Sequence, residues 1–342
     1  RFNWESPILL SRHNQDILYF GSNKFHRSMK QGEDMKTLSG DLTNGGRKGD
    51  VGYGTLTTID ESPLRFGLLY TGSDDGVIQT SKDGGYTWTR ISDKLPQNLW
   101  VSTVVASAHK QERVYTSLNG YRYDDFTPYL YVSEDNGRNW QRLGSNLPTE
   151  AINVVKEDPK NENLLYVGTD HGLYFSLDRG KTFMAMSNGM PAVAVHDLVV
   201  HPRENDLVVG THGRSIYIAP VEHLQQLTPE LMKENLHLFA LKQINYSERW
   251  GSKWGAWGEV MEPELVIPFY TSATGTTTIR IKTDKGQLLK EMKDESEKGL
   301  NYVTYNLSVD EANAKAYEAA LNTGKKEGDE NLKVTPADNK VI

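Results

Sequence analysis

The sequence contains no cysteine and no run of 18 apolar residues. The first absence excludes disulfide bonds, thiol nucleophiles and cysteine-ligated metal sites. The second predicts that no segment crosses a membrane as a helix. Basic residues are fewer than acidic ones, 38 against 45, which gives a net charge of −7. This balance argues against nucleic acid as a partner, because phosphate backbones select positively charged surfaces.

Common catalytic motifs are missing as well. The chain has no H-E-x-x-H or comparable metal-ligand spacing and no G-x-S-x-G nucleophile turn. We therefore assign no catalytic residue, no metal ligand and no cofactor. Calcium binding stays open, because the acidic pairs Asp74-Asp75 and Asp124-Asp125 offer oxygen ligands without the spacing of an EF-hand. The chain begins at Arg1 without a signal peptide, and we expect it to be processed or part of a longer chain.

A repeated octapeptide is the most informative feature of the 342 residues. Full copies occupy 81–88, 133–140 and 176–183, and a worn copy occupies 28–35. Their first residues, at positions 28, 81, 133 and 176, are 53, 52 and 43 residues apart, the length of one four-stranded propeller blade. The positions that define the full copies are an aspartate and an aromatic residue: Asp83 and Trp88, Asp135 and Trp140, Asp178 and Phe183.

Each octapeptide has the chemistry of a tight turn. The aspartate carboxylate can accept backbone N–H groups within the turn. The glycine two residues later can adopt a positive φ, and the aromatic side chain can cover the neighbouring core. These residues are therefore interpreted as structural, with no part in a site.

A second motif, an apolar strand with a tyrosine near its centre, precedes each octapeptide, as in 68–72 and 164–168. Together the motifs give the order strand, turn, strand, turn, strand, octapeptide, strand. Residues 1–220 are thus predicted to form about four and a half blades of an all-β propeller. Since an open propeller leaves exposed edges, we expect further blades upstream of Arg1 or from another chain.

The character of the chain changes after Pro220. Residues 221–261 read as a linker with a helix, in which Thr228 is a candidate N-cap, and a segment containing Trp250, Trp254 and Trp257. Alternating strands in 262–342 predict an immunoglobulin-like β-sandwich that is incomplete. Residues 310–322 are predicted to be helical.

The octapeptides resemble Asp-boxes, the BNR-type repeats of sialidases, sortilins and propeller xyloglucanases. Longer phrases, such as 124–131 and 195–215, resemble the sortilin-like BNR repeat proteins of bacteria, many from Bacteroidetes, that carry a glycosyl-hydrolase label. The resemblance covers about residues 1–220, and 262–307 resembles the hook-capping-type Ig-like module that commonly follows. It implies one seven-bladed propeller or a pair of them, and export to the periplasm, the outer-membrane surface or the medium, but no settled activity.

One blade contains about eight extra residues, in 119–129. This insert lies between the second and third strands, on the face where propellers usually bind ligands. Its residues Tyr121, Arg122, Asp124 and Asp125 suit recognition of a sugar or a peptide. The alternative is an ordered loop braced by Asp–Arg contacts.

His196, His212 and Arg214 are polar residues at predicted strand ends. They are candidates for binding at the central channel, and the alternative is that the histidines cap turns or join blades. The function predicted is an exported binding or assembly module for polypeptide or glycan, with cell-envelope subunits as further partners. The alternative is a glycosidase of the propeller xyloglucanase or sialidase-like type, with its catalytic carboxylates partly outside this chain.

Overall fold

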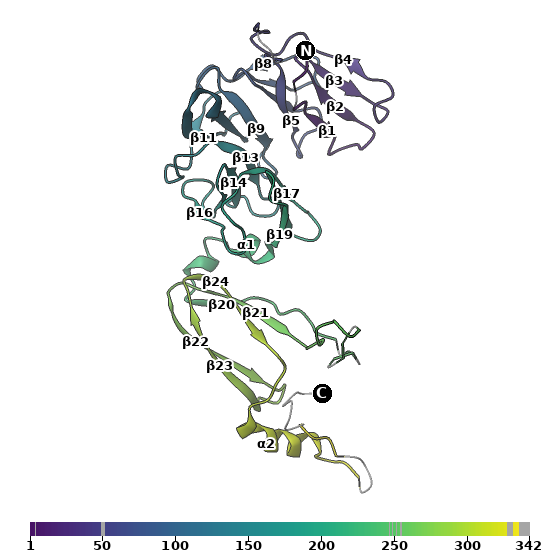
Figure 1. The fold of residues 1–342 in the computed structure, drawn as a ribbon, viewed down its shortest axis with the longest axis vertical. Coiled ribbons are helices and arrows are strands. Elements are labelled where there is room, and N and C mark those ends of the chain that lie inside the picture. Colours follow the sequence, from purple (N-terminus) through teal and green to yellow (C-terminus); the bar gives the residue numbers. More distant parts are fainter. Residues whose placement is uncertain are drawn as a thin grey trace. The chain divides into compact units, whose positions relative to one another are not determined.

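The computed structural model describes residues 1–3, 5–48, 52–245, 247, 249–250, 252–253, 255–326 and 331–334. The chain divides into two compact units, Arg1–Gln226 and Leu227–Ile342 (Figure 1). Trp254 lies outside the described residues. Among those described, no helix has the length and apolar character needed to cross a membrane.

The first unit consists of antiparallel sheets that follow one another along the chain as propeller blades do (Figure 1). Blade 1 contains β1 (Ile8–Leu10), β2 (Leu18–Gly21), β3 (Phe25–Ser28) and β4 (Lys36–Thr37), and blade 2 contains β5 (Leu56–Glu61), β6 (Leu69–Ser73), β7 (Ile78–Ser81) and β8 (Thr89–Arg90). Blade 3 contains β9 (Trp100–Ala106), β10 (Val114–Gly120), β11 (Asp125–Ser133) and β12 (Gln141–Arg142). Blade 4 contains β13 (Ile152–Glu157), β14 (Leu165–Thr169), β15 (Leu173–Ser176) and β16 (Met184–Ala185), and blade 5 has three strands, β17 (Val195–Val200), β18 (Asp206–Thr211) and β19 (Ile216–Pro220).

The hydrophobic core lies between successive blades. Three buried clusters each draw their residues from two neighbouring blades. The second strands β6 and β14 are buried at every residue, because blades cover both of their faces. The tyrosines of the repeated strand motif occupy the same register in blades 1 to 4 and are all buried: Tyr19, Tyr70, Tyr115 and Tyr166.

Buried carboxylates connect neighbouring blades. Glu61 at the end of β5 accepts hydrogen bonds from Ser11 Oγ at 2.6 Å and Tyr19 OH at 2.9 Å, both in blade 1. Glu157 at the end of β13 accepts the equivalent bond from Ser107 Oγ of blade 3 at 2.9 Å. Burial and the charge of Glu61 raise the pKa of Tyr19 far above its usual value, so this tyrosine stays a hydrogen-bond donor.

The octapeptide turns show the hydrogen bonds that their residue types favour. Asp83 accepts the N–H of Thr87 at 2.9 Å, and Ser81 Oγ accepts the N–H of Gly85, whose φ is +99°. In the worn copy, Ser28 Oγ likewise accepts the N–H of Gly32 at 2.8 Å, and it donates to Asp34 at 2.7 Å where Ser81 donates to Asp83. Asp34 therefore replaces the aspartate that this copy lacks at the usual position, six residues after the serine rather than two.

The second unit contains two separate sheets. One comprises β20 (Leu236–Leu238), β21 (Leu265–Thr271) and β24 (Gly299–Tyr305), and the other is a hairpin of β22 (Gly275–Lys282) and β23 (Leu288–Ser296). The helix predicted at 310–322 is confirmed as α2 (Glu311–Leu321), which packs near Leu289 and Val309. The segment 221–235 forms two short helices instead of one, α1 (Glu222–Gln226) in the first unit and η2 (Leu231–Lys233) in the second.

Candidate functional site

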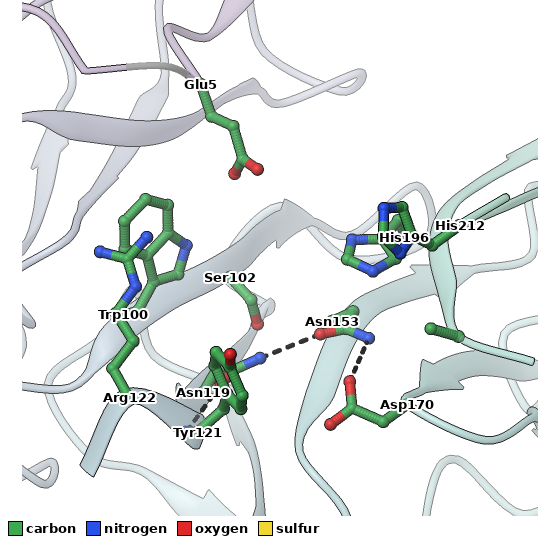
Figure 2. Close-up of a pocket in the computed structure, with 11 residues that line it drawn as sticks. Glu5, Trp100, Ser102, Asn119, Tyr121, Arg122, Asn153, Asp170, His196 and His212 are labelled. Atoms are coloured by element: carbon green, nitrogen blue, oxygen red, sulfur yellow. Dashed lines mark hydrogen bonds between the residues drawn. The ribbon is translucent and has the colours of Figure 1, made fainter.

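A cavity of about 470 Å³ opens in the first unit where the inner strands of blades 3, 4 and 5 begin. Its walls come from the starts of β9, β13 and β17, from the segments that follow β10, β14 and β18, and from Glu5 (Figure 2). The lining residues are Glu5, Trp100, Ser102, Asn119, Tyr121, Arg122, Asn153, Asp170, Ala194, His196 and His212.

A β-bulge at the same place in four inner strands aims side chains toward this region. In β5, β9, β13 and β17 the pairing with the second strand shifts by one residue near the start of the strand. The extra residues are Thr57, Ser102, Asn153 and His196. A bulge redirects a side chain without ending the strand, and the last three of these residues line the cavity.

Hydrogen bonds fix the polar floor of the cavity. Asn119 Nδ2 donates to Asn153 Oδ1 at 2.9 Å, and Asn153 Nδ2 donates to Asp170 Oδ1 at 3.0 Å (Figure 2). Asn119 Oδ1 also accepts the N–H of Tyr121 at 2.9 Å. Ser102 Oγ donates to the carbonyl of Ile152 at 2.8 Å, which joins blade 3 to blade 4. The floor is therefore preorganised by three strands and the insert.

The insert supplies one wall. It contains the short 3₁₀ helix η1 (Tyr121–Tyr123), which places the Arg122 guanidinium 4.2 Å from the ring centroid of Trp100. This is a cation–π contact, which orients the guanidinium without neutralising it. Within the described ranges no carboxylate lies within ion-pair distance of Arg122. Arg122 thus offers its charge and its donors to a ligand.

Two imidazoles form another part of the wall. The ring centroids of His196 and His212 are 5.5 Å apart, and the backbone N–H of His212 donates to the backbone carbonyl of Ala194 at 2.9 Å. Both histidines are exposed. The cavity therefore combines aromatic surfaces, a guanidinium, amides and the two carboxylates of Glu5 and Asp170, a set suited to a polar ligand with flat apolar faces.

Four of the residues predicted from the sequence meet in this cavity: Tyr121, Arg122, His196 and His212. Asp125 does not line it, because its carboxylate accepts the N–H of Thr127 at 3.0 Å and the hydroxyl of Tyr129 at 2.8 Å. Asp124 ends η1 with a φ of +54°, and Arg214 is exposed outside the lining. The contacts of Asp125 fit the alternative interpretation, an ordered loop braced by its aspartate. The bracing partner is Tyr129 and not an arginine.

The octapeptide turns lie away from the cavity. Strand β11 starts beside the insert and ends at Ser133, where the turn that contains Asp135 and Trp140 begins. The same strand direction in blades 2 and 4 puts Asp83, Trp88, Asp178 and Phe183 at the opposite edge of the sheets. Trp140 Nε1 donates to the Ile91 carbonyl of the preceding blade at 2.8 Å, as expected of a packing residue.

Of the two acidic pairs considered for calcium, Asp74-Asp75 accepts hydrogen bonds from protein donors. Asp74 accepts the N–H groups of Gly54 and Thr55, each at 2.9 Å, and Asp75 accepts Ser73 Oγ at 2.6 Å. Over the described part of the chain, no group of three His, Asp or Glu residues has metal-binding geometry.

The sequence interpretation missed Glu5, Trp100, Ser102, Asn153 and Asp170. A signal for two of them exists: near the start of four inner strands an aliphatic residue precedes a polar one, as in Val101-Ser102 and Ile152-Asn153. Trp100 and Asp170 enter the site because β9 and β14 bring them beside the insert, and Glu5 because the N-terminal segment reaches the cavity.

Residues 128–254 match the family model Sortilin-Vps10, described as sortilin, neurotensin receptor 3. No curated protein matches the chain.

Solved structures share the propeller fold. An ancestral GH74 enzyme is 12% identical, with a TM-score of 0.52, over 90% of this chain and 39% of its own. The GH74 xyloglucanase from Xanthomonas campestris is 13% identical, with a TM-score of 0.51, over 93% and 47%. The GH74 enzyme from Niastella koreensis is 15% identical, with a TM-score of 0.50, over 64% and 35%. The chain thus spans less than half the length of each, and the likeness shows the β-propeller fold.

Proposed function

We propose that this chain is a binding module that holds a polypeptide or glycan ligand in the cavity between blades 3, 4 and 5. The observation that carries the proposal is the oriented Arg122 guanidinium over Trp100, beside a floor fixed by Asn119 and Asn153. Aromatic faces suit sugar rings and aromatic or proline side chains. Arg122 adds a preference for a ligand that carries a carboxylate, because a guanidinium binds carboxylates through two parallel hydrogen bonds.

The setting that we propose is outside the cytoplasm, in the bacterial cell envelope, with the five blades as part of a seven-bladed propeller and the second unit as an Ig-like module. The Sortilin-Vps10 match over 128–254 supports a sortilin-like propeller. Fractionation of the cells that make the protein tests the location. Recovery in the periplasm, outer membrane or medium is expected, and recovery only with cytoplasmic proteins would contradict it.

The binding test starts from a peptide array and a panel of soluble polysaccharides probed with the labelled protein. Hits are then titrated against wild type, Trp100→Ala, Arg122→Ala and the control Arg138→Ala. Arg138 is exposed in an octapeptide turn, away from the cavity. We expect both cavity variants to lose about tenfold or more in affinity, the equivalent of roughly 1.4 kcal/mol, and the control to bind as wild type. Equal binding by all four proteins would contradict the site.

A second function is supported by the two carboxylates of the cavity, Glu5 and Asp170, which come from different parts of the unit. Glycosidases use a pair of carboxyl groups on either side of the scissile bond, and one solved neighbour is named a xyloglucanase. As a glycosidase, the chain would use these groups together with carboxylates outside residues 1–342. Release of reducing ends from xyloglucan, lost in Glu5→Gln and Asp170→Asn, would support this function. Absence of release by a full-length wild-type protein that includes the outside carboxylates would contradict it.

A further inference from the structure

A second arginine lies over an aromatic ring on the face where the cavity opens. The Arg47 guanidinium is 4.4 Å from the ring centroid of Tyr53, which repeats the pair that Arg122 forms with the Trp100 ring. Tyr53 stands three residues before β5 of blade 2, and Trp100 opens β9 of blade 3, so both pairs lie at the starts of inner strands. Blades 2 and 3 each contact a neighbouring blade on both sides, and the pairs are exposed with those neighbours present.

Arg47 is held in place without losing its charge. Its Nη2 donates to Asn98 Oδ1 at 2.8 Å, just before β9. Arg47 is exposed, and among the described residues no carboxylate lies within ion-pair distance of it. Asp75, whose charge reaches Tyr53, is fully buried and accepts hydrogen bonds from protein groups. Arg47, like Arg122, thus keeps donors and a positive charge for a ligand.

The insert connects the two pairs. Tyr123 follows Arg122 in η1, and burial together with the neighbouring Tyr123 hydroxyl raises the pKa of Tyr53 above its ordinary value. The tyrosines of blades 2 and 3 are therefore neighbours. Tyr123 is 53% exposed, and Tyr121, which lines the cavity, is 60% exposed. We call the row Arg122, Tyr123, Tyr53 and Arg47 the cationic track, because it leads from the cavity across the insert to a second free cation in blade 2.

The charges on this face select a ligand with more than one acid group. A guanidinium binds a carboxylate through two parallel hydrogen bonds, and the track has two guanidiniums. Inside the cavity, Glu5 and Asp170 are negatively charged and repel a second acid group there. The second acid group of a ligand bound at Arg122 therefore lies outside the cavity, where Arg47 is the free cation of the track. A chain with acid groups along its length meets both conditions.

The backbone contacts that would hold an extended peptide are taken at this face. Extended peptides add to a free strand edge, and the inner strands β9 and β13 border the cavity. The Val101 carbonyl of β9 accepts Thr57 Oγ1 at 2.6 Å. The Ile152 carbonyl of β13 accepts Ser102 Oγ at 2.8 Å. The track offers the exposed faces of tyrosines instead, which suit sugar rings. The observations therefore favour a chain of sugar acids over an acidic peptide.

We propose that the cationic track binds a polyuronate, a polysaccharide built of uronic acids, with one carboxylate at Arg122 and a later one at Arg47. The sugar rings between these carboxylates lie over Tyr123. The proposal rests on the function proposed for the cavity, since both use Arg122. It adds the class of the ligand and a second binding region in blade 2, so substitution of Arg47 separates it from the cavity function in an experiment.

The probes are hexamers of galacturonate, of mannuronate and of guluronate, titrated by calorimetry. The matched control for each is the same hexamer with methyl esters in place of its carboxylates, which keeps the rings and removes the charges. A hexamer of glutamate presents acid groups without sugar rings. The proteins are wild type, Arg47→Ala, Arg122→Ala and Arg138→Ala. Arg138 is an exposed arginine outside the track, so its loss changes the net charge as much as the loss of Arg47 does.

We expect saturable binding of at least one uronate hexamer to wild type. Arg47→Ala and Arg122→Ala should each lower its affinity about tenfold or more, as loss of a charge-assisted hydrogen bond predicts. Arg138→Ala should bind as wild type does. The methyl ester and the glutamate hexamer should each bind wild type at least about tenfold more weakly than the uronate does. These two controls use unmodified protein, so a folding defect in a variant leaves the test intact.

Four results would overturn the proposal. The first is a loss of affinity in Arg122→Ala with wild-type affinity in Arg47→Ala, which would leave the cavity function standing without the track. The second is equal affinity for a uronate hexamer and its methyl ester, because the acid groups would then not be recognised. The third is equal affinity for the glutamate hexamer, which would make the ligand an acidic peptide. The fourth is no saturable binding of any uronate hexamer by wild type at millimolar concentration; the cavity function is then decided by its own peptide array and polysaccharide panel.

Discussion

The amide of Asn119 donates a 2.9 Å hydrogen bond to the side-chain carbonyl of Asn153. Asn119 stands at the start of the insert in blade 3, and Asn153 is the extra residue of the bulge in blade 4. The bond therefore ties the irregular part of one blade to the irregular part of the next. Since Arg122 follows Asn119 by three residues, the position of the guanidinium depends on this link.

Replacement of Asn153 by leucine removes the bonds to Asn119 and Asp170 while keeping a side chain of similar size. We expect the free energy of unfolding to fall by about 1–2 kcal/mol, the net value of one or two hydrogen bonds. His196→Leu changes the same bulge position in blade 5, where the side chain is exposed, and should stay within about 0.5 kcal/mol of wild type. Urea unfolding measures both, and equal effects would contradict the role of Asn153.

We expect the buried carboxylate of Glu61 to contribute more to the stability of the fold than an exposed carboxylate does. It is fully buried and accepts hydrogen bonds from Ser11, Tyr19 and the N–H of Gly67. Glu61→Gln replaces one acceptor oxygen by a donor, so some of these groups lose their partner, at a cost of about 1–3 kcal/mol. Glu33→Gln, on an exposed turn, is the control. A urea midpoint for Glu61→Gln as high as that of the control would rule out this link between blades 1 and 2.

We expect acid to lower the stability that the octapeptide turns contribute, over a pH range set by the pKa values of their aspartates. The hydroxyl and N–H of Thr87 lower the pKa of Asp83 from 3.8 to about 2, and the N–H of Asn139 lowers that of Asp135 to about 2. A carboxyl group with a lowered folded-state pKa stabilises the fold above its unfolded pKa and loses that contribution as the pH falls toward the folded one. The contribution is therefore complete above about pH 4 and decreases toward pH 2.

Asp83→Asn tests this dependence. The variant should be less stable than wild type at pH 6, and the difference should shrink between about pH 4 and pH 2. Asp124→Asn is the matched control, because the Asp124 side chain is exposed and Asn also tolerates its φ of +54°. Thermal unfolding across this pH range measures the effect. A difference between wild type and Asp83→Asn that stays constant down to pH 2 would contradict it.

The repeat made most of the propeller unit predictable, because its residue types determine local structure. The octapeptide predicts a turn from Asp83 and Gly85 alone, and the spacing of the copies predicts the blades. The cavity was predictable only in part. Arg122 and Tyr121 were found through a break in the spacing, whereas Ser102 and Asn153 depend on bulges, which are a property of strand pairing and not of one strand's sequence.

The worn octapeptide shows a similar limit. Its missing aspartate is replaced by Asp34, which reaches back to Ser28 because the turn has a different course. Spacing alone assigns no role to that residue. The meeting of distant parts of the chain, as of Glu5 and Asp170 in one cavity, likewise follows from how the blades are arranged in space and leaves no local pattern.

The contact between blades 1 and 2 offers a sensitive test of the repeat's packing. Gly85 has a φ of +99°, and a Cβ at this position would lie 2.5 Å from the Phe25 ring. Gly85→Ala therefore incurs both backbone strain and a clash with a side chain that is itself fully buried. Gly213 has a similar φ, +77°, but a Cβ there would meet nothing within 4 Å.

Gly213→Ala should thus cost about 1–2 kcal/mol for backbone strain alone, and Gly85→Ala should cost roughly 1–3 kcal/mol more through overpacking. Urea unfolding of the two variants gives the difference directly, since the conformational contribution is common to both. Phe25→Leu in the Gly85→Ala background should recover part of the loss, because a smaller side chain frees the space. Equal destabilisation by the two glycine substitutions, or no recovery with Phe25→Leu, would show that the octapeptide glycine is required for its backbone conformation and not for close packing between blades.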